Sequence, residues 1–178
     1  CVTTPCMYHH ASKDLFVVAH VDDFLCSGEP RELQWLTSDL EKQFELTKKF
    51  IGPGQEGEYL GRTIRWSHTG ISIEGNNKYV DLMATEWNLM KQSVLFTPGS
   101  AEDKRDPGGE EALNPDEATA FRRSAAMGIY MAQDRGDISY ASKEIARGMA
   151  APTLKDAIKL KKLIRYLLGA KRRATLFR

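Results

Sequence analysis

The stretch that decides the fold is residues 15–28, LFVVAHVDDFLCSG. An apolar run over 15–19 leads into two adjacent acids, Asp22 and Asp23, and a second short apolar run follows them. Short runs rich in Val and Phe predict buried strands. Acids between buried strands carry a desolvation cost, which either a hydrated turn or a bound divalent cation would offset. The function of the chain depends on which of these two applies.

Length and composition narrow the class of protein. The 178 residues are 42% hydrophobic and 28% charged, enough for one substantial core or two small ones. No run approaches the roughly 18 to 20 apolar residues of a membrane span, and no signal peptide is visible. The three cysteines favour a reducing compartment over a disulfide framework. We therefore expect an intracellular protein, cytoplasmic or nuclear, with no membrane partner. Because the chain begins at Cys1, we also expect a segment excised from a longer protein.

The first half of the chain mixes strands and helices, which predicts an α+β fold. The patterns predict strands over 3–10, 45–50, 58–66 and 71–74, and an amphipathic helix over 29–44. The apolar stripe of this helix, from Leu33 to Phe44, is expected to lie in the core. Gly61 inside a predicted strand indicates a bulge or a close backbone approach.

The second half is predicted to be helical. An Asn cap at Asn76 or Asn77 starts a helix to about residue 91, and a polar linker over 97–113 follows. Further helices are expected over 114–133, 137–149 and 153–169, and a last strand over 174–177. Asn114 caps the first of these helices, and Thr153 with Asp156 forms a capping box on the third.

Positive charge gathers at the end of the chain. The net charge is +1, but residues 143–178 hold 11 basic and 2 acidic residues. Lys155, Lys159 and Lys162 fall close together on one face of the last predicted helix. Four further cations extend this charge: Arg165, Lys171, Arg172 and Arg173. The block is either a solvated face or a surface that binds a polyanion such as nucleic acid.

The acid pair suits a hard cation. Mg²⁺ is bound in proteins by one or two carboxylates together with substrate phosphates. In polymerases and nucleases two such ions stabilise the attacking and leaving oxygens. A zinc site near the N-terminus is disfavoured, because the spacing of Cys1 and Cys6 departs from the usual ligand spacing and no second pair follows.

Five segments, in order and in spacing, resemble the C-terminal half of the reverse transcriptase of copia-type LTR retrotransposons. They are residues 21–23, 59–64, 121–132, 137–141 and 160–169, and the likeness extends over about residues 4–177. Val21, Asp22 and Asp23 are similar to the end of that family's Tyr-Val-Asp-Asp catalytic box. A second group is similar to its Phe-Leu-Gly-x-x-Ile hairpin, which grips the primer strand: Tyr59, Leu60, Gly61 and Arg62.

The resemblance implies a partial polymerase palm over 1–75, with antiparallel strands, a helix and a hairpin like the primer grip. A helical thumb or connection over 76–169 and the start of a tether toward an RNase H domain over 170–178 follow. Asp22 and Asp23 are then catalytic residues and ligands of two Mg²⁺ ions in the complete enzyme. Its partners are an RNA or DNA template-primer, a dNTP and the missing N-terminal fingers and palm segment, which carries a third catalytic Asp.

The sequence departs from the family pattern at two further places. His20 stands where the family has Tyr, and residues 134–137, Asp-Arg-Gly-Asp, replace Thr-Arg-Pro-Asp. We expect part of an RNA-directed DNA polymerase that is inactive as this isolated chain. Two alternatives stay open: a degenerate or domesticated remnant that only binds nucleic acid, and an unrelated α+β domain in which the two acids form a solvated turn. Trp66, beside the expected hairpin, is the aromatic residue most suited to contact a base.

Overall fold

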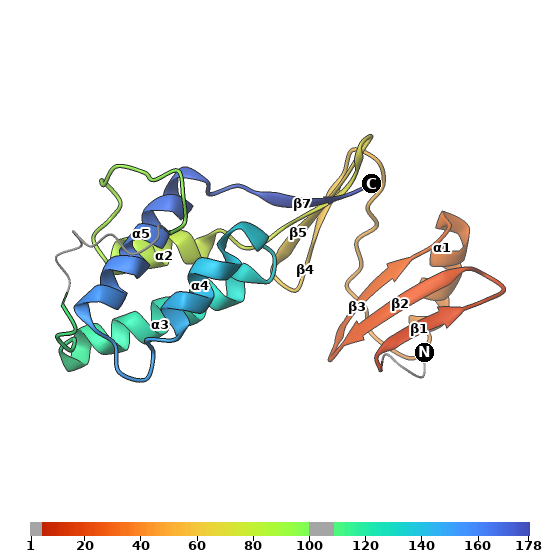
Figure 1. The fold of residues 1–178 in the computed structure, drawn as a ribbon. Coiled ribbons are helices and arrows are strands. Elements are labelled where there is room, and N and C mark those ends of the chain that lie inside the picture. Colours follow the sequence, from red (N-terminus) through yellow and green to blue (C-terminus); the bar gives the residue numbers. More distant parts are fainter. Residues whose placement is uncertain (1–4, 100–108) are drawn as a thin grey trace.

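A computed structural model describes residues 5–99 and 109–178 of the chain, which form three connected parts (Figure 1). A three-stranded sheet with one helix lies at one end, a four-stranded sheet lies in the middle, and a group of helices lies at the other end. The arrangement is a mixed α+β one. Cys1 and most of the predicted linker over 97–113 lie outside the described residues.

The first sheet is antiparallel, and we call it the carboxylate sheet because it carries Asp22 and Asp23. Its strand order is β1-β2-β3, and helix α1 follows it in the chain: β1 (Met7–His10), β2 (Leu15–His20), β3 (Asp23–Ser27) and α1 (Pro30–Leu40). Helix α1 lies against the sheet, since the rings of His10 and Trp35 are 5.7 Å apart and the Lys13 ammonium lies 4.3 Å from the Trp35 ring.

The carboxylate sheet buries fewer of its apolar side chains than its sequence predicts. Leu15 is 1% exposed, but Phe16 and Phe24 are 44% and 42% exposed. Helix α1 ends at Leu40 and has no buried residue, so the prediction that its apolar stripe forms core is wrong. The predicted strand over 45–50 is also wrong, because those residues form neither strand nor helix.

The second sheet has the order β4-β5-β6-β7 with antiparallel neighbours: β4 (Glu56–Tyr59), β5 (Arg62–Ser67), β6 (Gly70–Glu74) and β7 (Ala174–Phe177). The single strand predicted over 58–66 is wrong, because Leu60 and Gly61 have φ angles of 48° and 72° and turn the chain back. Two positive φ angles in a two-residue loop match the right-handed twist of the flanking strands. The hairpin predicted to turn near residues 67–70 is confirmed.

The helices form the third part, which we call the helical body: α2 (Lys78–Glu86), α3 (Pro115–Ala132), the short 3₁₀ helix η1 (Gly136–Ile138), α4 (Ser139–Ala146) and α5 (Leu154–Gly169). Two predicted caps are confirmed. The Asn114 side chain accepts a hydrogen bond from the Glu117 amide, and Thr153 and Asp156 form a reciprocal capping box. Helix α2 is shorter than predicted and ends at Glu86.

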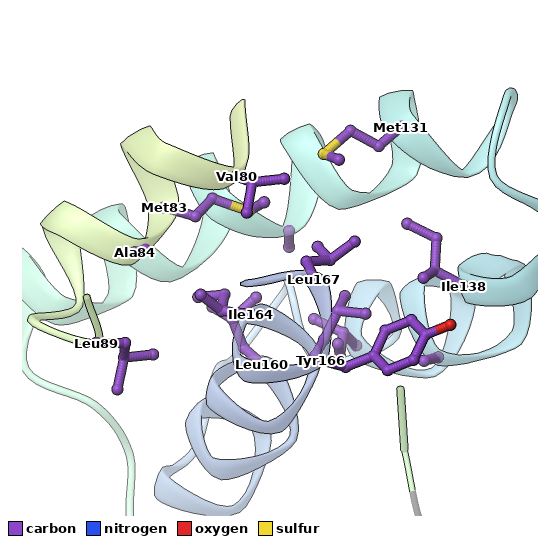
Figure 2. Packing of buried hydrophobic residues seen from close by; sticks show 14 of the residues in the cluster. Val80, Met83, Ala84, Leu89, Met131, Ile138, Leu160, Ile164, Tyr166 and Leu167 are labelled. Atoms are coloured by element: carbon purple, nitrogen blue, oxygen red, sulfur yellow. The ribbon is translucent and has the colours of Figure 1, made fainter. Parts of the chain in front are cut away.

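Helices α2 to α5 enclose the main hydrophobic core of the described residues (Figure 2). Phe121 of α3 and Leu160, Leu163 and Ile164 of α5 are 0% exposed. Their burial follows the 3.6-residue period of α3 and α5, which places their apolar side chains on the inner faces. This core stabilises the helical body without help from either sheet.

The C-terminal segment returns to the second sheet. After α5 the chain runs back, and β7 pairs antiparallel with β6, as the sequence pattern over 174–177 predicts. The backbone of Phe177 lies where a side chain at Gly70 would project, so a glycine is required there. The tether predicted over 170–178 stays a prediction, as do the predicted palm and thumb boundaries. In the structure, residues 174–177 are part of a sheet.

Candidate functional site

The turn between β2 and β3 presents the acid pair. His20 and Asp23 are opposite each other in the register, so Val21 and Asp22 form a two-residue connection. Val21 has a φ of 53° and is 84% exposed. A β-branched residue at positive φ is strained, and such strain clusters at functional sites. The turn is therefore an exposed and strained tip of the carboxylate sheet.

Both carboxylates at this tip are exposed to solvent. The expected desolvation cost is therefore absent from the structure, because both acids are in contact with solvent. Carboxylate oxygens nonetheless suit Mg²⁺, which is bound by one or two carboxylates when phosphates supply the remaining oxygens. Across residues 5–99 and 109–178, no group of three or more His, Cys, Asp or Glu side chains is placed to hold a metal. The described residues therefore give two donors and not a closed metal site.

The hairpin turn between β4 and β5 lies near strand β3. Tyr59 ends β4, and its hydroxyl oxygen is buried without a hydrogen-bond partner among the described residues. Burial raises the pKa of Tyr59, and the nearby negative charges of Asp23 and Cys26 raise it further. Asp23 and Cys26 both belong to β3.

The other side of the same hairpin is attached to the helical body. Arg62 is opposite Tyr59 in the register, and its Nε donates to the Asp134 carboxylate at 2.7 Å. This hydrogen bond and ion pair raise the pKa of Arg62. Its guanidinium carbon also lies 5.9 Å from the centre of the Tyr130 ring. The four residues Tyr59 to Arg62, predicted inside one strand, thus form a tight turn that Arg62 attaches to the helical body.

Contacts within the chain engage several of the cations that the sequence assigns to nucleic-acid binding. On α5, Lys159 pairs with Asp156 at 3.7 Å, and Arg165 donates to the backbone and hydroxyl oxygens of Ser93 at 2.7 and 2.6 Å. Lys155 and Lys162 also have partners. Lys155, Lys159 and Lys162 of α5 are half-buried, so the expected basic stripe is a less open surface than the sequence alone indicates.

Three consecutive cations after α5 connect the second sheet to the helical body. Lys171 pairs with Asp81 of α2 at 2.7 Å. Arg172 pairs with Glu74 at 3.1 Å, and Arg173 pairs with Asp137 at 3.5 Å.

Two acids in this network have lowered pKa values. Arg172, Arg65 and Asn77 hold the pKa of Glu74 at about 2. Arg135 and Tyr166 hold that of Asp137 at about 2, with the Tyr166 hydroxyl donating at 2.6 Å. Sequence reasoning missed the pairings of Glu74 with Arg172 and of Asp137 with Tyr166, because these partners are 98 and 29 residues apart and no local pattern marks them.

A shallow hollow lies on the surface of the helical body. It has a volume of about 470 Å³ between α3 and α4, and its lining includes Ile129, Ala132, Ser142, Lys143 and Arg147. None of the carboxylate-sheet residues lines it. Of the two cysteines considered for a zinc site near the N-terminus, Cys6 is exposed and Cys1 lies outside the described residues. No helix of the described residues is long and apolar enough to cross a membrane.

Comparison with known proteins gives two relatives in Arabidopsis thaliana. The chain is 28% identical over 158 residues to a retrovirus-related Pol polyprotein from transposon RE1, and the match covers 87% of this chain and 10% of that protein. It is also 28% identical over 156 residues to an uncharacterized mitochondrial protein. That match covers 87% of this chain and 62% of the mitochondrial protein. No family model matches, and no solved structure matches. The chain is therefore similar to a region of a retrotransposon Pol polyprotein and spans less than two thirds of either relative.

Proposed function

We propose that the chain is the C-terminal part of the reverse transcriptase of a copia-type retrotransposon, an RNA-directed DNA polymerase. The observation that carries the proposal is the strained, exposed Asp22–Asp23 tip of the tight β2–β3 turn. The similarity to a Pol polyprotein supports the same assignment. In this proposal the carboxylate sheet belongs to the palm, the hairpin holds the primer, and the helical body is the thumb.

Asp22 and Asp23 would supply the carboxylate oxygens for Mg²⁺ in the complete enzyme. Two bound ions would stabilise the charges on the primer 3′-oxygen and on the leaving diphosphate. The donor chemistry fits, but the described residues offer only two donors at this tip. The residues of this chain therefore present the carboxylates and orient them on a paired strand, while further oxygens come from the nucleotide and from an upstream carboxylate.

It follows that the isolated chain is inactive. Primer extension on poly(A) with an oligo(dT) primer tests this directly. We expect no extension by the 178-residue chain, and extension when the chain is joined to the upstream region of the Pol polyprotein. Robust extension by the chain alone would contradict the proposal, because the nucleotide pocket and the third carboxylate lie outside it.

A non-enzymatic function is the second candidate. It is favoured by His20, which replaces the family's Tyr and pairs across the strands with Asp23. In that case the chain binds nucleic acid but supports no extension even when the upstream region is joined. Fluorescence anisotropy with a primer–template duplex measures the binding, and its affinity falls steeply with salt if phosphate contacts dominate. No binding at low salt would exclude this candidate.

The alternative in which the two acids form a solvated turn predicts that divalent cations bind the Asp22–Asp23 tip no more strongly than they bind other exposed acids. Mn²⁺ broadens the NMR signals of nuclei close to it, so a titration locates any binding. Under the proposed function, broadening is centred on residues 21–24, and weak binding is expected from two donors. Equal broadening at unrelated exposed acids, such as Asp116 and Glu117 at the start of α3, would favour the solvated turn.

A further inference from the structure

The last strand of the chain carries no buried side chain. Its four residues, Ala174–Phe177, are all exposed, and β7 pairs with β6 at the edge of the second sheet. Three cations directly precede it, and each pairs with an acid on a different element: Lys171, Arg172 and Arg173. We call residues 171–177 the C-terminal strap. Strand pairing and these three ion pairs are its main attachments to the rest of the molecule.

The buried acid Glu74 does not depend on the strap for a partner. Besides Arg172, its carboxylate accepts hydrogen bonds from the guanidinium of Arg65 and, at 2.7 Å, from the side-chain amide of Asn77. A buried charge left without a partner is strongly destabilising. Because Arg65 and Asn77 both stay in place, Arg172 can leave Glu74 without that cost.

Asp137 also has partners outside the strap. The guanidinium of Arg135 donates to both of its carboxylate oxygens, at 2.9 and 2.8 Å, and the Tyr166 hydroxyl donates at 2.6 Å. Arg173 lies further from this carboxylate, at 3.5 Å, and its guanidinium carbon is 5.7 Å from the centre of the Tyr166 ring. The strap therefore contributes the longest of the ion pairs and hydrogen bonds of Asp137.

The remaining ion pair, Lys171 with Asp81, lies at the surface. Its two side chains are 38% and 46% exposed, and exposed ion pairs contribute little to stability. The side chains of Arg172 and Arg173 are 68% and 55% exposed. All three cations of the strap are thus open to a partner from solution, and the acids that hold them keep other partners or contact water.

We propose that a nucleic-acid backbone displaces the strap: its phosphates replace the three acids as partners of Lys171, Arg172 and Arg173, and β7 separates from β6. Arginine binds phosphate through paired hydrogen bonds, and counterion release favours such contacts. The acids lie on α2, β6 and η1, so one continuous backbone that contacts all three cations has to draw them away from these elements. The acids then compete with the phosphates. The choice of nucleic acid as partner rests on the proposed function.

The first test compares two exposed acids that each pair with a lysine. Asp81→Asn removes the competitor of Lys171, whereas Asp39→Asn makes the same change of charge and frees Lys42 near the end of α1. Fluorescence anisotropy at low salt measures the affinity of each variant for a primer–template duplex. We expect Asp81→Asn to bind roughly twofold to fivefold more tightly than Asp39→Asn, a range set by the modest strength of an exposed ion pair. Equal affinities would overturn the proposal, and so would the absence of binding by the unchanged chain.

The second test is hydrogen exchange of the unchanged chain, free and saturated with duplex. Backbone amides that pair β6 with β7 should exchange faster in the complex, while those that pair β4 with β5 should not. Binding without release of β7 predicts unchanged or slower exchange at β7, and that result would overturn the proposal. Failure of the proposed function appears in primer extension by the chain joined to the upstream region, so the two failures are distinguishable.

Discussion

The helical body and the carboxylate sheet have similar apolar content in sequence but very different cores. Fifteen buried residues from α2 to α5 and their connections form one cluster in the helical body. In the carboxylate sheet and α1, by contrast, Leu15 is the buried hydrophobic residue among those described. Burial of apolar area is the main favourable term in folding. The helical body therefore holds itself together, while the carboxylate sheet depends on strand pairing and a single helix.

Because of this difference, the residues that stabilise the fold and the residues of the candidate site lie in different regions. The region with the core contains the caps and the ion-pair network, and the region with little core carries the strained acid pair. Ligand-binding elements are generally drawn from the less stable parts of a fold. In the proposed function, the upstream palm segment would cover the exposed Phe and Val side chains of the carboxylate sheet.

The largest expected effect compares two phenylalanines. Phe121 of α3 is 0% exposed and Phe24 of β3 is 42% exposed. Replacing a buried Phe by Ala costs about 3 to 5 kcal/mol, because apolar contacts are lost and a cavity is left. We expect Phe121→Ala to fall in that range and Phe24→Ala to cost less than about 1 kcal/mol. Urea unfolding followed by circular dichroism measures both, and equal losses would contradict the proposed difference between the regions.

Acid is expected to weaken the joint between the second sheet and the helical body. Glu74 is 5% exposed, and its pKa is lowered to about 2 by Arg172, Arg65 and Asn77. A pKa that is lower in the folded protein than in the unfolded chain means that the charged carboxylate stabilises the folded state. The contribution is therefore complete above about pH 4.5 and is lost as the pH falls toward 2, on the order of 2 kcal/mol.

Unfolding measured between pH 6 and pH 2 tests this prediction for Glu74. Glu74→Gln should lower stability at neutral pH, because Arg172 and Arg65 lose their partner, and should flatten the profile below pH 4.5. The exposed Glu58 on β4 of the same sheet provides the control, since Glu58→Gln removes a carboxylate that lies outside this ion-pair network. An unchanged slope in Glu74→Gln would show that this carboxylate does not hold the joint.

The smallest effect concerns the starts of two helices. Thr153 accepts a hydrogen bond from the Asp156 amide in the capping box of α5, whereas Glu29 at the start of α1 makes no side-chain cap. Thr153→Ala should lower the free energy of unfolding by about 1 kcal/mol. Glu29→Ser should leave it unchanged or raise it by a few tenths of a kcal/mol. Thermal unfolding of the two variants checks this. A loss in Glu29→Ser as large as that in Thr153→Ala would mean that α1 is capped by another route.

Local patterns in the sequence predict the helical body well. Asn114 and Thr153 mark two helix starts, and the apolar spacing of α5 predicts its buried face, because caps and periodicity act within a few residues. The apolar run of β2 was misleading for the opposite reason. Val and Phe favour a strand locally, but whether a strand is buried depends on what packs against it. Among the described residues, α1 is the helix that lies against this sheet.

The site was predicted in part. The acid pair and the Tyr59–Arg62 segment are visible as motifs, yet the turn at Leu60 was hidden because a non-glycine residue occupies a positive φ. The ion pairs of Arg62 with Asp134 and of Arg172 with Glu74 join residues 72 and 98 positions apart. No composition or spacing rule points to such pairs. They appear only once the sheet and the helices are placed together.

The central claim is that the exposed acid pair at the β2–β3 turn is the catalytic part of a polymerase. It is tested most directly by Asp22→Asn in this chain joined to the upstream Pol region, with Asp14→Asn as the control. Asp14 is also an exposed acid beside a turn of the same sheet. The proposal predicts that Asp22→Asn lowers primer extension about a hundredfold or more, as loss of a metal ligand worth several kcal/mol implies. It also predicts that Asp14→Asn keeps full activity. Equal extension by the two variants would contradict the claim.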